Sequence, residues 1–381
     1  MNSKYRVVAD GIDIFTNDDP LINVKLNLEV NSAGSLGFTM PKMHMFYDNV
    51  QILKTTIEVY EMYAEDEWRW IFTGRPITID YDFKNNKKVR CEGAMAFFND
   101  TLQPYHVYDD DVFIRDFFTT LIHNHNWTDE NEEIARVEAN RQIFKGNVTI
   151  PIGDRPIYRK TNFETTKDCL TTMCIDTTGG YMIVSKEAKS QEDDTQVLKL
   201  NWYNEITEMS NQPIQFGLNL TELTKTSDGE NLYSIIQPYA EYEDNGTTYV
   251  ITSDPIEIPG LVSLYGKITK KVAFEGVTDA TTLATYAQAW VDSQEWAHEF
   301  TIECDAADLN GLDSDIYPYE PFTLGTKVHV TSSIHGINLY LPITKMEIDL
   351  SSASRSLSIG TPSKPSLSEI VKPTNELFVE W

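Results

Sequence analysis

The stretch IFTGRPITIDYDFKNNKKVRCEGAMAFFNDT, from Ile71 to Thr101, decides the fold class of this 381-residue chain. Two runs of β-prone residues flank the polar segment KNNK, which is the pattern of a β-hairpin. The first arm carries TGR, the second carries CEG, and the aromatic segment AMAFF follows. The stretch contains no motif typical of a nucleophile, a metal cluster or a phosphate-binding loop. The reason for so ordered a hairpin therefore lies in the elements around it.

Short strands surround this hairpin in the first hundred residues. Apolar residues alternate along NVKLNLEV, at the two-residue period of a strand: Val24, Leu26, Leu28 and Val30. The turn residues NSAG follow, and SLGFTMP returns as the next strand. A further strand, TTIEVYEMY, has these apolar positions: Ile57, Val59 and Tyr63. Closely spaced strands joined by tight turns predict a small β-barrel or β-sandwich over residues 1–104.

The pattern changes near Pro104, where apolar residues recur at helical spacing. The segment YDDDVFIRDFFTTLIHNH has two apolar stripes: Phe113, Phe117 and Leu121, and Ile114, Phe118 and Ile122. We expect Asp110 or Asp111 to cap this helix. A second helix is predicted in TNFETTKDCLTTMCI, with a capping box of Thr161 and Glu164 and a stop at Gly179-Gly180. Its expected buried residues are Phe163, Leu170, Met173 and Cys174. With the strands YMIVS and TQVLKLNWY, these helices predict an α/β insert over residues 105–204.

Strands dominate again beyond Ile206. A hairpin is predicted with arms at about 235–243 and 247–251 around the turn Asn245-Gly246. One helical excursion, at about 278–298, has Asp279 as its expected cap. Its apolar stripe is Leu283, Tyr286, Ala287, Trp290 and Val291. One face of a later strand carries Met346, Ile348 and Leu350. These patterns predict a second β module over residues 205–360, followed by a Pro/Ser-rich C-terminal tail over 361–381.

The composition is that of a folded protein with a strong negative charge. Hydrophobic residues make up 41% of the chain, and the formal net charge is -27. Such a polyanion does not hold nucleic acid through clustered Lys and Arg, and it repels nucleic acid that passes close by. The N-terminus lacks the apolar core of a signal peptide, and no stretch reaches the roughly 18 apolar residues of a membrane span. We expect no membrane anchor, and four cysteines buried as thiols in a reducing cytoplasm: Cys91, Cys169, Cys174 and Cys304.

Each candidate for chemistry has a simpler structural interpretation. In HNHN, His123 and His125 lie two apart at a helix end and point in different directions, which favours a surface helix terminus over a metal site. The run Asp109–Asp111 is better explained by helix capping than by cation binding, and Glu192–Asp194 by a solvated loop. No G-x-S-x-G, H-E-x-x-H, P-loop or G-x-G-x-x-G motif occurs. The sequence therefore predicts a protein that is not an enzyme, with no catalytic, metal-binding or cofactor-binding residues.

Set beside its neighbours, the opening hairpin resembles a known protein module. The similarity lies in SLGFTMPKMHMFYDNVQILKTTIEVYE and in the later WIFTGRPITIDYDFKNNKKVRCEGAMAFFNDTLQP. This region is similar to the N-terminal module of bacteriophage tail-associated, or baseplate-hub, proteins. NLTELTKTSDGENLYSIIQPYAEYE and the strands between Ala306 and Gly360 resemble later segments of that family, in the same order. The similarity covers about Leu36 to Gly360. Ala240 stands where the family usually has Gly, and many relatives continue beyond the point where this chain ends, into a fibre and a peptidoglycan-cutting domain.

The resemblance implies a mainly β fold with α+β insertions: two tail-tube-like antiparallel β-barrels and an α/β insert. It implies a virion structural protein at the distal tail, a homotrimeric hub that adapts the six-fold tail tube to a three-fold tip. The hub would form or close the channel through which DNA and the tape-measure protein leave. Its partners would be the distal tail or tail-tube ring protein, the tape-measure protein and receptor-binding or fibre proteins. Viral DNA would pass through the lumen without specific binding, because acidic residues repel it.

Three other functions stay open at this point. A cell-wall-degrading tail hydrolase is disfavoured, because its catalytic domain would follow Gly360, where 21 residues remain. The hub of a phage-tail-like injection system fits the same resemblance, and gene neighbours would separate it from a phage. Glycan binding through exposed Trp68, Trp70 or Trp127 is less favoured than packing of these side chains in a core or an interface.

Overall fold

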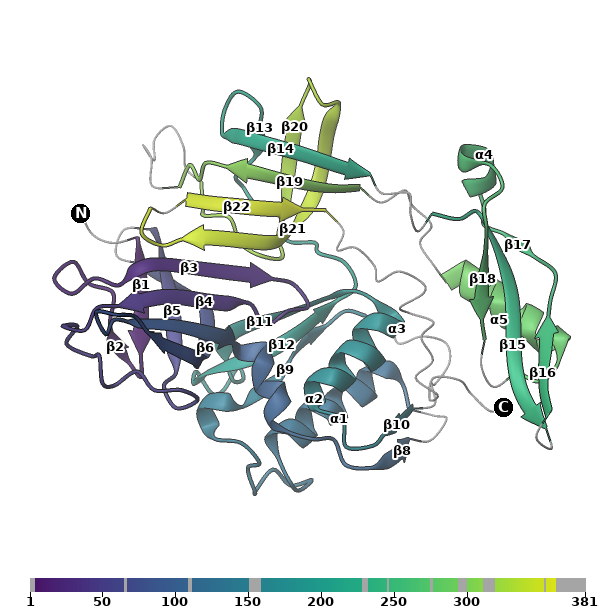
Figure 1. Ribbon diagram of the computed structural model, residues 1–381, viewed down its shortest axis with the longest axis horizontal. Helices are drawn as coiled ribbons and strands as arrows, with labels where there is room; N and C mark the ends of the chain where they lie inside the picture. Colours follow the sequence, from purple (N-terminus) through teal and green to yellow (C-terminus); the bar gives the residue numbers. More distant parts are fainter. Residues whose placement is uncertain are drawn as a thin grey trace.

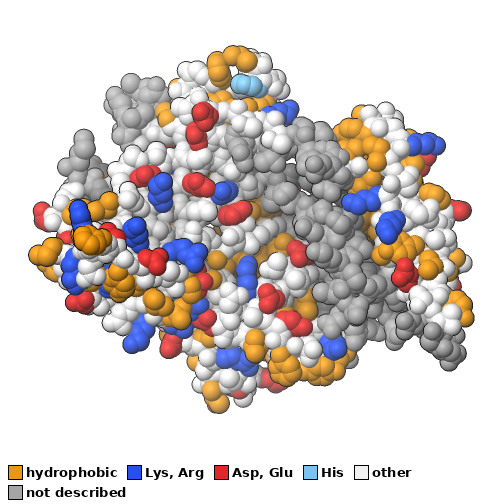
Figure 2. Space-filling model, viewed as in Figure 1, with side chains coloured by type: hydrophobic (Ala, Val, Ile, Leu, Met, Phe, Trp, Pro, Cys, Tyr) orange, Lys and Arg blue, Asp and Glu red, His pale blue; other side chains and the backbone are white. Residues whose placement is uncertain are grey.

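The computed structural model describes residues 4–64, 67–108, 112–150, 159–227, 232–244, 247–274, 277–293, 300–310, 319–352 and 354–360. Figure 1 shows four groups of elements, which we name by their strands. The first β unit contains β1–β7, the insert β8–β12, the second β unit β13, β14 and β19–β22, and the outer unit β15–β18. Charged side chains of both signs are scattered over the visible face of the first β unit (Figure 2).

Most strands of the first β unit coincide with predicted ones, but its first two strands, β1 and β2, were not predicted. Its elements are β1 (Tyr5–Ala9), β2 (Ile12–Asp13), β3 (Ile22–Glu29), β4 (Ser35–Met40), β5 (Ile57–Ala64), β6 (Glu67–Tyr81) and β7 (Lys87–Gly93). The hairpin of β6 and β7 is confirmed as an antiparallel pair. Asp82 Oδ1 holds its turn by accepting hydrogen bonds from the backbone N–H groups of Lys84 (2.8 Å) and Asn86 (2.9 Å). The predicted inward residues of β3 are buried, from Val24 to Val30.

Strands of the second β unit continue the sheet of the first. They are β13 (Ile214–Gln215), β14 (Leu220–Ser227), β19 (Phe300–Ala306), β20 (Lys327–Ser332), β21 (Ile337–Asp349) and β22 (Ser354–Ile359). Strand β21 pairs with β22 on one side and with β3 on the other, through Met346 opposite Leu28. The resulting order is β14-β19-β22-β21-β3-β4-β7-β6-β5-β1-β2. The mainly β class is therefore confirmed, and the described strands pair as one open, continuous sheet; the division into two barrels stays a prediction.

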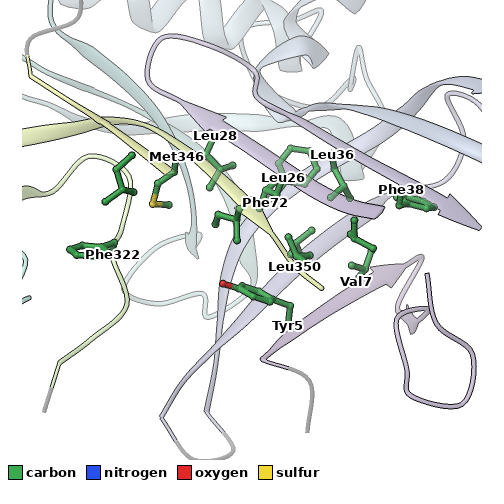
Figure 3. Packing of buried hydrophobic residues seen from close by; sticks show 14 of the residues in the cluster. Tyr5, Val7, Leu26, Leu28, Leu36, Phe38, Phe72, Phe322, Met346 and Leu350 are labelled. Carbon is green, nitrogen blue, oxygen red and sulfur yellow. The ribbon is translucent and has the colours of Figure 1, made fainter. Parts of the chain in front are cut away.

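One hydrophobic core serves both β units. The cluster joins residues of the first unit, such as Tyr5 and Leu36, to Phe322, Met346 and Leu350 of the second. Figure 3 shows these side chains pointing toward one another between the strands. Burial of this apolar surface is the main stabilising contribution, at about 25 cal/mol per Å² removed from water. The two β units are therefore energetically coupled.

The insert is a small α/β layer with a core of its own. Its elements are η1 (Ala94–Asp100), β8 (His106–Tyr108), α1 (Ile114–Asn126), η2 (Ala139–Arg141), β9 (Ile143–Val148), β10 (Arg159–Thr161), α2 (Thr166–Asp168), the π-helical η3 (Cys169–Ile175), α3 (Asp176–Thr178), β11 (Tyr181–Ala188) and β12 (Gln196–Tyr203). The sheet β11-β12-β9 packs against α1, whose predicted inward residues Phe117, Phe118 and Leu121 are fully buried. The second helix ends at Gly179, with φ +77°, as predicted.

Three details of the insert differ from the sequence predictions. Helix α1 has Phe113 at its N-cap, so neither Asp110 nor Asp111 is its cap; both lie outside the described residues. The second helix begins later than predicted, because Thr161 still belongs to β10; its N-cap is Thr165, whose side chain accepts from Asp168 N–H at 3.0 Å. Phe163 is 61% exposed, since the chain turns there with φ +66° to reach the helix.

The outer unit is a four-stranded sheet covered by a helix. It comprises β15 (Ile235–Asp244), β16 (Thr247–Thr252), β17 (Ile256–Glu257), α4 (Leu261–Tyr265), β18 (Thr269–Ala273) and α5 (Ala280–Ser293). The hairpin of β15 and β16 is confirmed, while its predicted turn residues Asn245-Gly246 lie outside the described residues. Asp279 caps α5, accepting from Thr281 N–H (3.0 Å) and Thr282 N–H (2.8 Å). A separate hydrophobic cluster, which includes Leu283 and Ala287, forms its core.

None of the described helices is long and apolar enough to cross a membrane. The boundaries proposed from sequence, at residues 104, 204 and 360, stay predictions, and the tail over 361–381 lies outside the described residues.

Candidate functional site: the ionic clusters that join the units

The TGR and CEG segments of the opening hairpin meet in an ionic cluster. Arg75 of β6 lies opposite Glu92 of β7, and its Nε donates to Glu92 Oε1 at 2.9 Å. Its two terminal nitrogens donate to the carboxylate of Asp100, at 2.5 and 2.8 Å. Arg141 of the insert lies 3.5 Å from the same carboxylate. A planar guanidinium suits this two-pronged contact, so Arg75 fixes the hairpin, η1 and the insert relative to one another.

The glycines of these segments are required by close backbone packing. A Cβ atom on Gly93 would lie 1.8 Å from the carbonyl oxygen of Ala33, and one on Gly74 would lie 2.3 Å from that of Glu92. Gly93 also donates its N–H to Gly34 O at 3.2 Å. The two segments therefore serve packing and geometry, which answers why the hairpin carries no visible chemistry.

A second cluster lies buried where the two β units meet. Arg355 of β22 is fully buried and forms an ion pair with Glu61 of β5, which is also buried. Its Nε lies 3.0 Å from Asp308 Oδ2, and its NH1 donates to Phe322 O at 2.8 Å. Lys4 adds a weaker contact to Asp308 at 3.4 Å. Buried ions of opposite charge gain little net stability as a pair, but an unpaired one is very costly, so this cluster restricts how the two units are arranged.

The surroundings of this cluster shift the pKa values of its members. Burial lowers the pKa of Arg355 and of Arg69, and it raises the pKa of Tyr5. An arginine keeps its charge even so. Tyr5 therefore stays protonated, and its hydroxyl oxygen accepts from Arg355 NH2 at 3.0 Å. Arg69 extends the cluster outward by donating to Glu61 Oε2 (3.1 Å) and Thr323 Oγ1 (2.8 Å).

A third cluster connects the first β unit to the insert. Lys186 of β11 donates to Glu58 of β5 at 2.5 Å and to the hydroxyl of Tyr60 at 3.2 Å. Burial lowers the pKa of Lys186, but the hydrogen bonds from its ammonium group to Glu58 and Tyr60 outweigh this effect and leave that pKa raised. Thr73 also donates to Glu58, at 3.2 Å. Glu58 is thus a shared acceptor that binds the insert to the sheet.

Residues of the second and third clusters contribute to the wall of a cavity of about 330 Å³. Elements of the first β unit, the insert and the second β unit line it. Its apolar wall includes Trp70, Phe72, Met182, Phe322, Leu324 and Met346. Arg69 and Lys186 lie at its edge, both already engaged with carboxylates. The cavity marks the point where three units meet.

The histidines of the HNHN segment differ in their environment. They do point in different directions: His123 Nε2 faces Asp129 O at 3.1 Å, whereas His125 faces Thr101 and Arg141. The expectation of a surface helix terminus is wrong for His125, which is fully buried. Its Nδ1 lies 2.8 Å from Thr101 Oγ1 and its Nε2 lies 3.2 Å from Arg141 O. Burial lowers the pKa of His125 to about 4, so it is a neutral structural residue.

The other sequence candidates are placed as follows. All four cysteines are buried and free, as expected, and burial raises the pKa of Cys169 and Cys304 to about 12. In the part of the chain that the structure describes, no three His, Cys, Asp or Glu side chains are grouped as a metal site. Asp109–Asp111 lie outside that part. Glu192–Asp194 form the loop between β11 and β12, with Glu192 and Asp194 exposed.

The tryptophans proposed for glycan stacking are only partly exposed. Trp68 is covered by the guanidinium of Arg6, 4.1 Å from the ring centre. Trp70 packs against the core of the insert and donates its Nε1–H to Thr73 Oγ1 at 2.8 Å. Trp127 is half-buried at the end of α1.

Sequence reasoning missed Glu61 and Arg355, the centre of the buried cluster. The signal was present for Glu61, because Ile57, Val59 and Glu61 alternate and so face the same side of β5. A charged residue at an inward position requires a buried partner of opposite charge. Nothing in the sequence indicated that this partner would be Arg355, 294 residues away.

Known structures share the fold of this chain over nearly its whole length. The 43 kDa tail protein of prophage MuSo2 from Shewanella oneidensis aligns with a TM-score of 0.57 and 12% identity, over 94% of this chain and 98% of its own. A tail protein from Neisseria meningitidis aligns with a TM-score of 0.57 and 13% identity, over 96% of this chain and 99% of its own. The fold is that of phage tail proteins. Prophage tail protein gp18 from Listeria monocytogenes aligns with a TM-score of 0.51 and 12% identity, over 97% of this chain and 100% of its own.

The comparison with known protein families agrees with the phage tail fold. A family described as prophage endopeptidase tail matches residues 207–368, which include the second β unit and the outer unit. No curated protein sequence matches this chain. The resemblance to phage tail proteins that the sequence indicated is therefore confirmed. Each ionic cluster above joins separate elements of the fold through ion pairs between its own basic and acidic side chains.

Proposed function

We propose that this protein is a structural component of a phage tail, the homotrimeric hub at its distal end. The observation that carries the proposal is the likeness of fold to phage tail proteins over 94% or more of the chain. The continuous sheet and shared core of the two β units suit this role, because they hold the two units in one fixed arrangement. The hub would connect the six-fold tail tube to a three-fold tip.

The channel function follows from the same proposal. Three copies would enclose a lumen through which the tape-measure protein and DNA leave the particle. Acidic residues that face this lumen would repel DNA, so that it passes without adsorbing. Residues 205–360 carry 23 Asp and Glu against 7 Lys and Arg, whereas residues 1–104 carry 15 against 11. We therefore assign the DNA-repelling surface to the second β unit and the outer unit; a neutral or basic lumen in the assembled ring would contradict this.

The remaining parts of the proposal concern partners and boundaries. The ring would contact the distal tail or tail-tube ring protein on one side, and the tape-measure protein inside. Receptor-binding or fibre proteins would attach at the tip. We propose domain limits at residues 104, 204 and 360, with the ionic clusters of Arg75 and Lys186 as the fixed points between the first two domains. Assembly would take place in the host cytoplasm and end in the virion.

The family description favours a second candidate, an endopeptidase, which would correspond to the cell-wall-degrading tail hydrolase that the sequence left open. We propose that this chain has a structural role, because each cluster described above consists of charges that are paired within the fold. Incubation of the purified protein with peptidoglycan, followed by analysis of released peptides, tests this. No release above that of a heat-denatured sample is expected, and release that depends on folded protein would establish the enzyme instead.

Assembly itself is tested by the native mass at several concentrations together with class averages from electron microscopy. The hub predicts a ring of three copies with a central hole. A ring of another symmetry would contradict the proposal.

A further inference from the structure

Two segments of the second β unit that lie side by side contain no charged residues. Residues 209–221 and 328–344 contain no Asp, Glu, Lys or Arg, in a chain with a net charge of -27. The two segments are far apart in sequence but adjacent in the fold, because β13 pairs in parallel with β20, with Ile214 opposite Val330. The N–H of Phe216 continues this contact with a hydrogen bond to Thr331 O at 3.0 Å. We call this surface the uncharged tip.

The uncharged tip exposes large apolar side chains. Those with at least two fifths of their surface exposed are Met209, Phe216, Leu218, Ile334, Leu339 and Tyr340. In Figure 2, hydrophobic side chains and a histidine gather at the top of the molecule, over β20 and the neighbouring loop. Scattered apolar residues on a surface are ordinary, but a group without any charge among them is typical of the centre of an interface.

Hydrogen bonds and ring stacking hold the uncharged tip in a fixed shape. His329 stacks on Tyr340 with ring centres 4.4 Å apart, and its Nε2 lies 2.8 Å from Asn338 Oδ1. His335 Nδ1 lies 2.7 Å from Ser332 Oγ, which closes the turn of the hairpin. A surface whose side chains are already ordered loses little conformational entropy when it is covered. The apolar side chains of the uncharged tip are therefore exposed on an ordered surface and not on a loose loop.

The hairpin also presents an open strand edge. Residues Ile337 to Pro342 of β21 pair with β20 on one side, whereas β22 and β3 pair with β21 only from Ile343 onward. Among the described strands, nothing pairs with the other edge of β21 from Ile337 to Leu341, whereas the carbonyl of Pro342 already accepts from Gly360 N–H at 2.9 Å. Unpaired edges of apolar strands readily accept contacts from another polypeptide.

We infer that the uncharged tip is the surface through which this protein docks onto a second copy of itself, an inference that rests on the homotrimer proposed above. Two copies that approach through the acidic parts of residues 205–360 bring like charges together, which opposes contact. The uncharged tip allows apolar burial without this repulsion. A basic partner would gain more from the acidic surface around the tip, whereas a second acidic copy is repelled by that surface and not by the tip.

The test compares two substitutions of the same kind on the full chain. Ile334→Lys places a charge at the uncharged tip, where the side chain is 68% exposed; Leu264→Lys places it on α4 of the outer unit, where the side chain is 70% exposed. Both sites are exposed in the single chain, so neither change is expected to alter the unfolding temperature. Sedimentation equilibrium of the three proteins then gives their dissociation constants.

The inference predicts a trimer for the wild type and for Leu264→Lys, and at least a tenfold weaker association for Ile334→Lys. An Ile334→Lys protein that associates as tightly as the wild type would overturn the inference while leaving the trimer intact. A wild type that stays monomeric at every concentration would overturn the homotrimer and the inference with it.

Discussion

Arg75 and Asp100, 25 residues apart, form a two-pronged contact in which both terminal nitrogens of the guanidinium donate to one carboxylate, at 2.5 and 2.8 Å. The same arginine reaches Glu92 across the hairpin. This pair joins the end of η1 to the strand that begins the hairpin, and Arg141 connects it to the insert. Its geometry requires an arginine, because a lysine offers a single point charge.

Replacement of Asp100 by Asn therefore reduces stability. The change leaves Arg75, whose side chain is only 7% exposed, with one carboxylate partner in place of two. We expect a loss of about 1–3 kcal/mol in the free energy of unfolding, as for a hydrogen-bonded charge that loses its partner. Urea denaturation measures it. Glu138→Gln, at an exposed partner of Arg141, is the matched control and is expected to change stability by less than about 0.5 kcal/mol.

The buried pair of Arg355 and Glu61 makes a stronger prediction. Arg355→Met leaves Glu61 and Asp308 buried without their main cation, which is expected to cost about 3–5 kcal/mol. Glu61→Gln alone is also expected to destabilise. In the double variant the two losses should not add, because each substitution removes the same contact. Simple additivity within about 0.5 kcal/mol would show that the pair is not coupled.

Gly93 provides a prediction with a close control. Gly93→Ala places a Cβ atom 1.8 Å from Ala33 O, so the turn between β3 and β4 has to move. Gly37, in the adjacent strand β4, has nothing within 4 Å of the corresponding position. We expect Gly93→Ala to lower the melting temperature strongly or to prevent folding, and Gly37→Ala to leave it nearly unchanged. Equal melting temperatures for the two variants would show that the packing around Gly93 is not tight.

The burial of His125 predicts a dependence of stability on pH. Its pKa is lowered from 6.5 to about 4 in the folded chain, because burial opposes the charged form. Between these values the unfolded chain binds more protons than the folded chain, so acidification destabilises the protein, by about 3 kcal/mol across this range. His125→Gln should remove this part of the slope between pH 6.5 and 4.5. An NMR titration in which His125 protonates near pH 6.5 would refute the explanation.

The spacing of apolar residues was sufficient to predict many of the individual strands and helices of this chain. Alternation in β3 and β21, helical stripes in α1 and α5, and the cap at Asp279 were all predicted, because each depends on residues close in sequence. The pairing of β3 with β21 was not, since many strands of similar composition could lie next to each other. The single core of the two β units follows from that pairing and was missed for the same reason.

Two errors concern single residues whose surroundings decide their burial. Phe163 fits an apolar helical stripe, yet the chain adopts a left-handed φ at this residue and exposes the ring. His125 is polar and near a helix end, yet Thr101 and the carbonyl of Arg141 satisfy both ring nitrogens, which allows burial. Neither outcome is visible in residue type or spacing. The resemblance of the whole chain to phage tail proteins was stronger evidence, because it rests on several segments in order.

The most direct test of the proposed hub is electron microscopy of the purified protein, with native mass spectrometry of the same sample. The account predicts a particle of three copies, with three-fold class averages, a central hole and a nearly six-fold outline. A particle that remains a monomer at the highest concentration reached, or a ring with another number of copies, would contradict it.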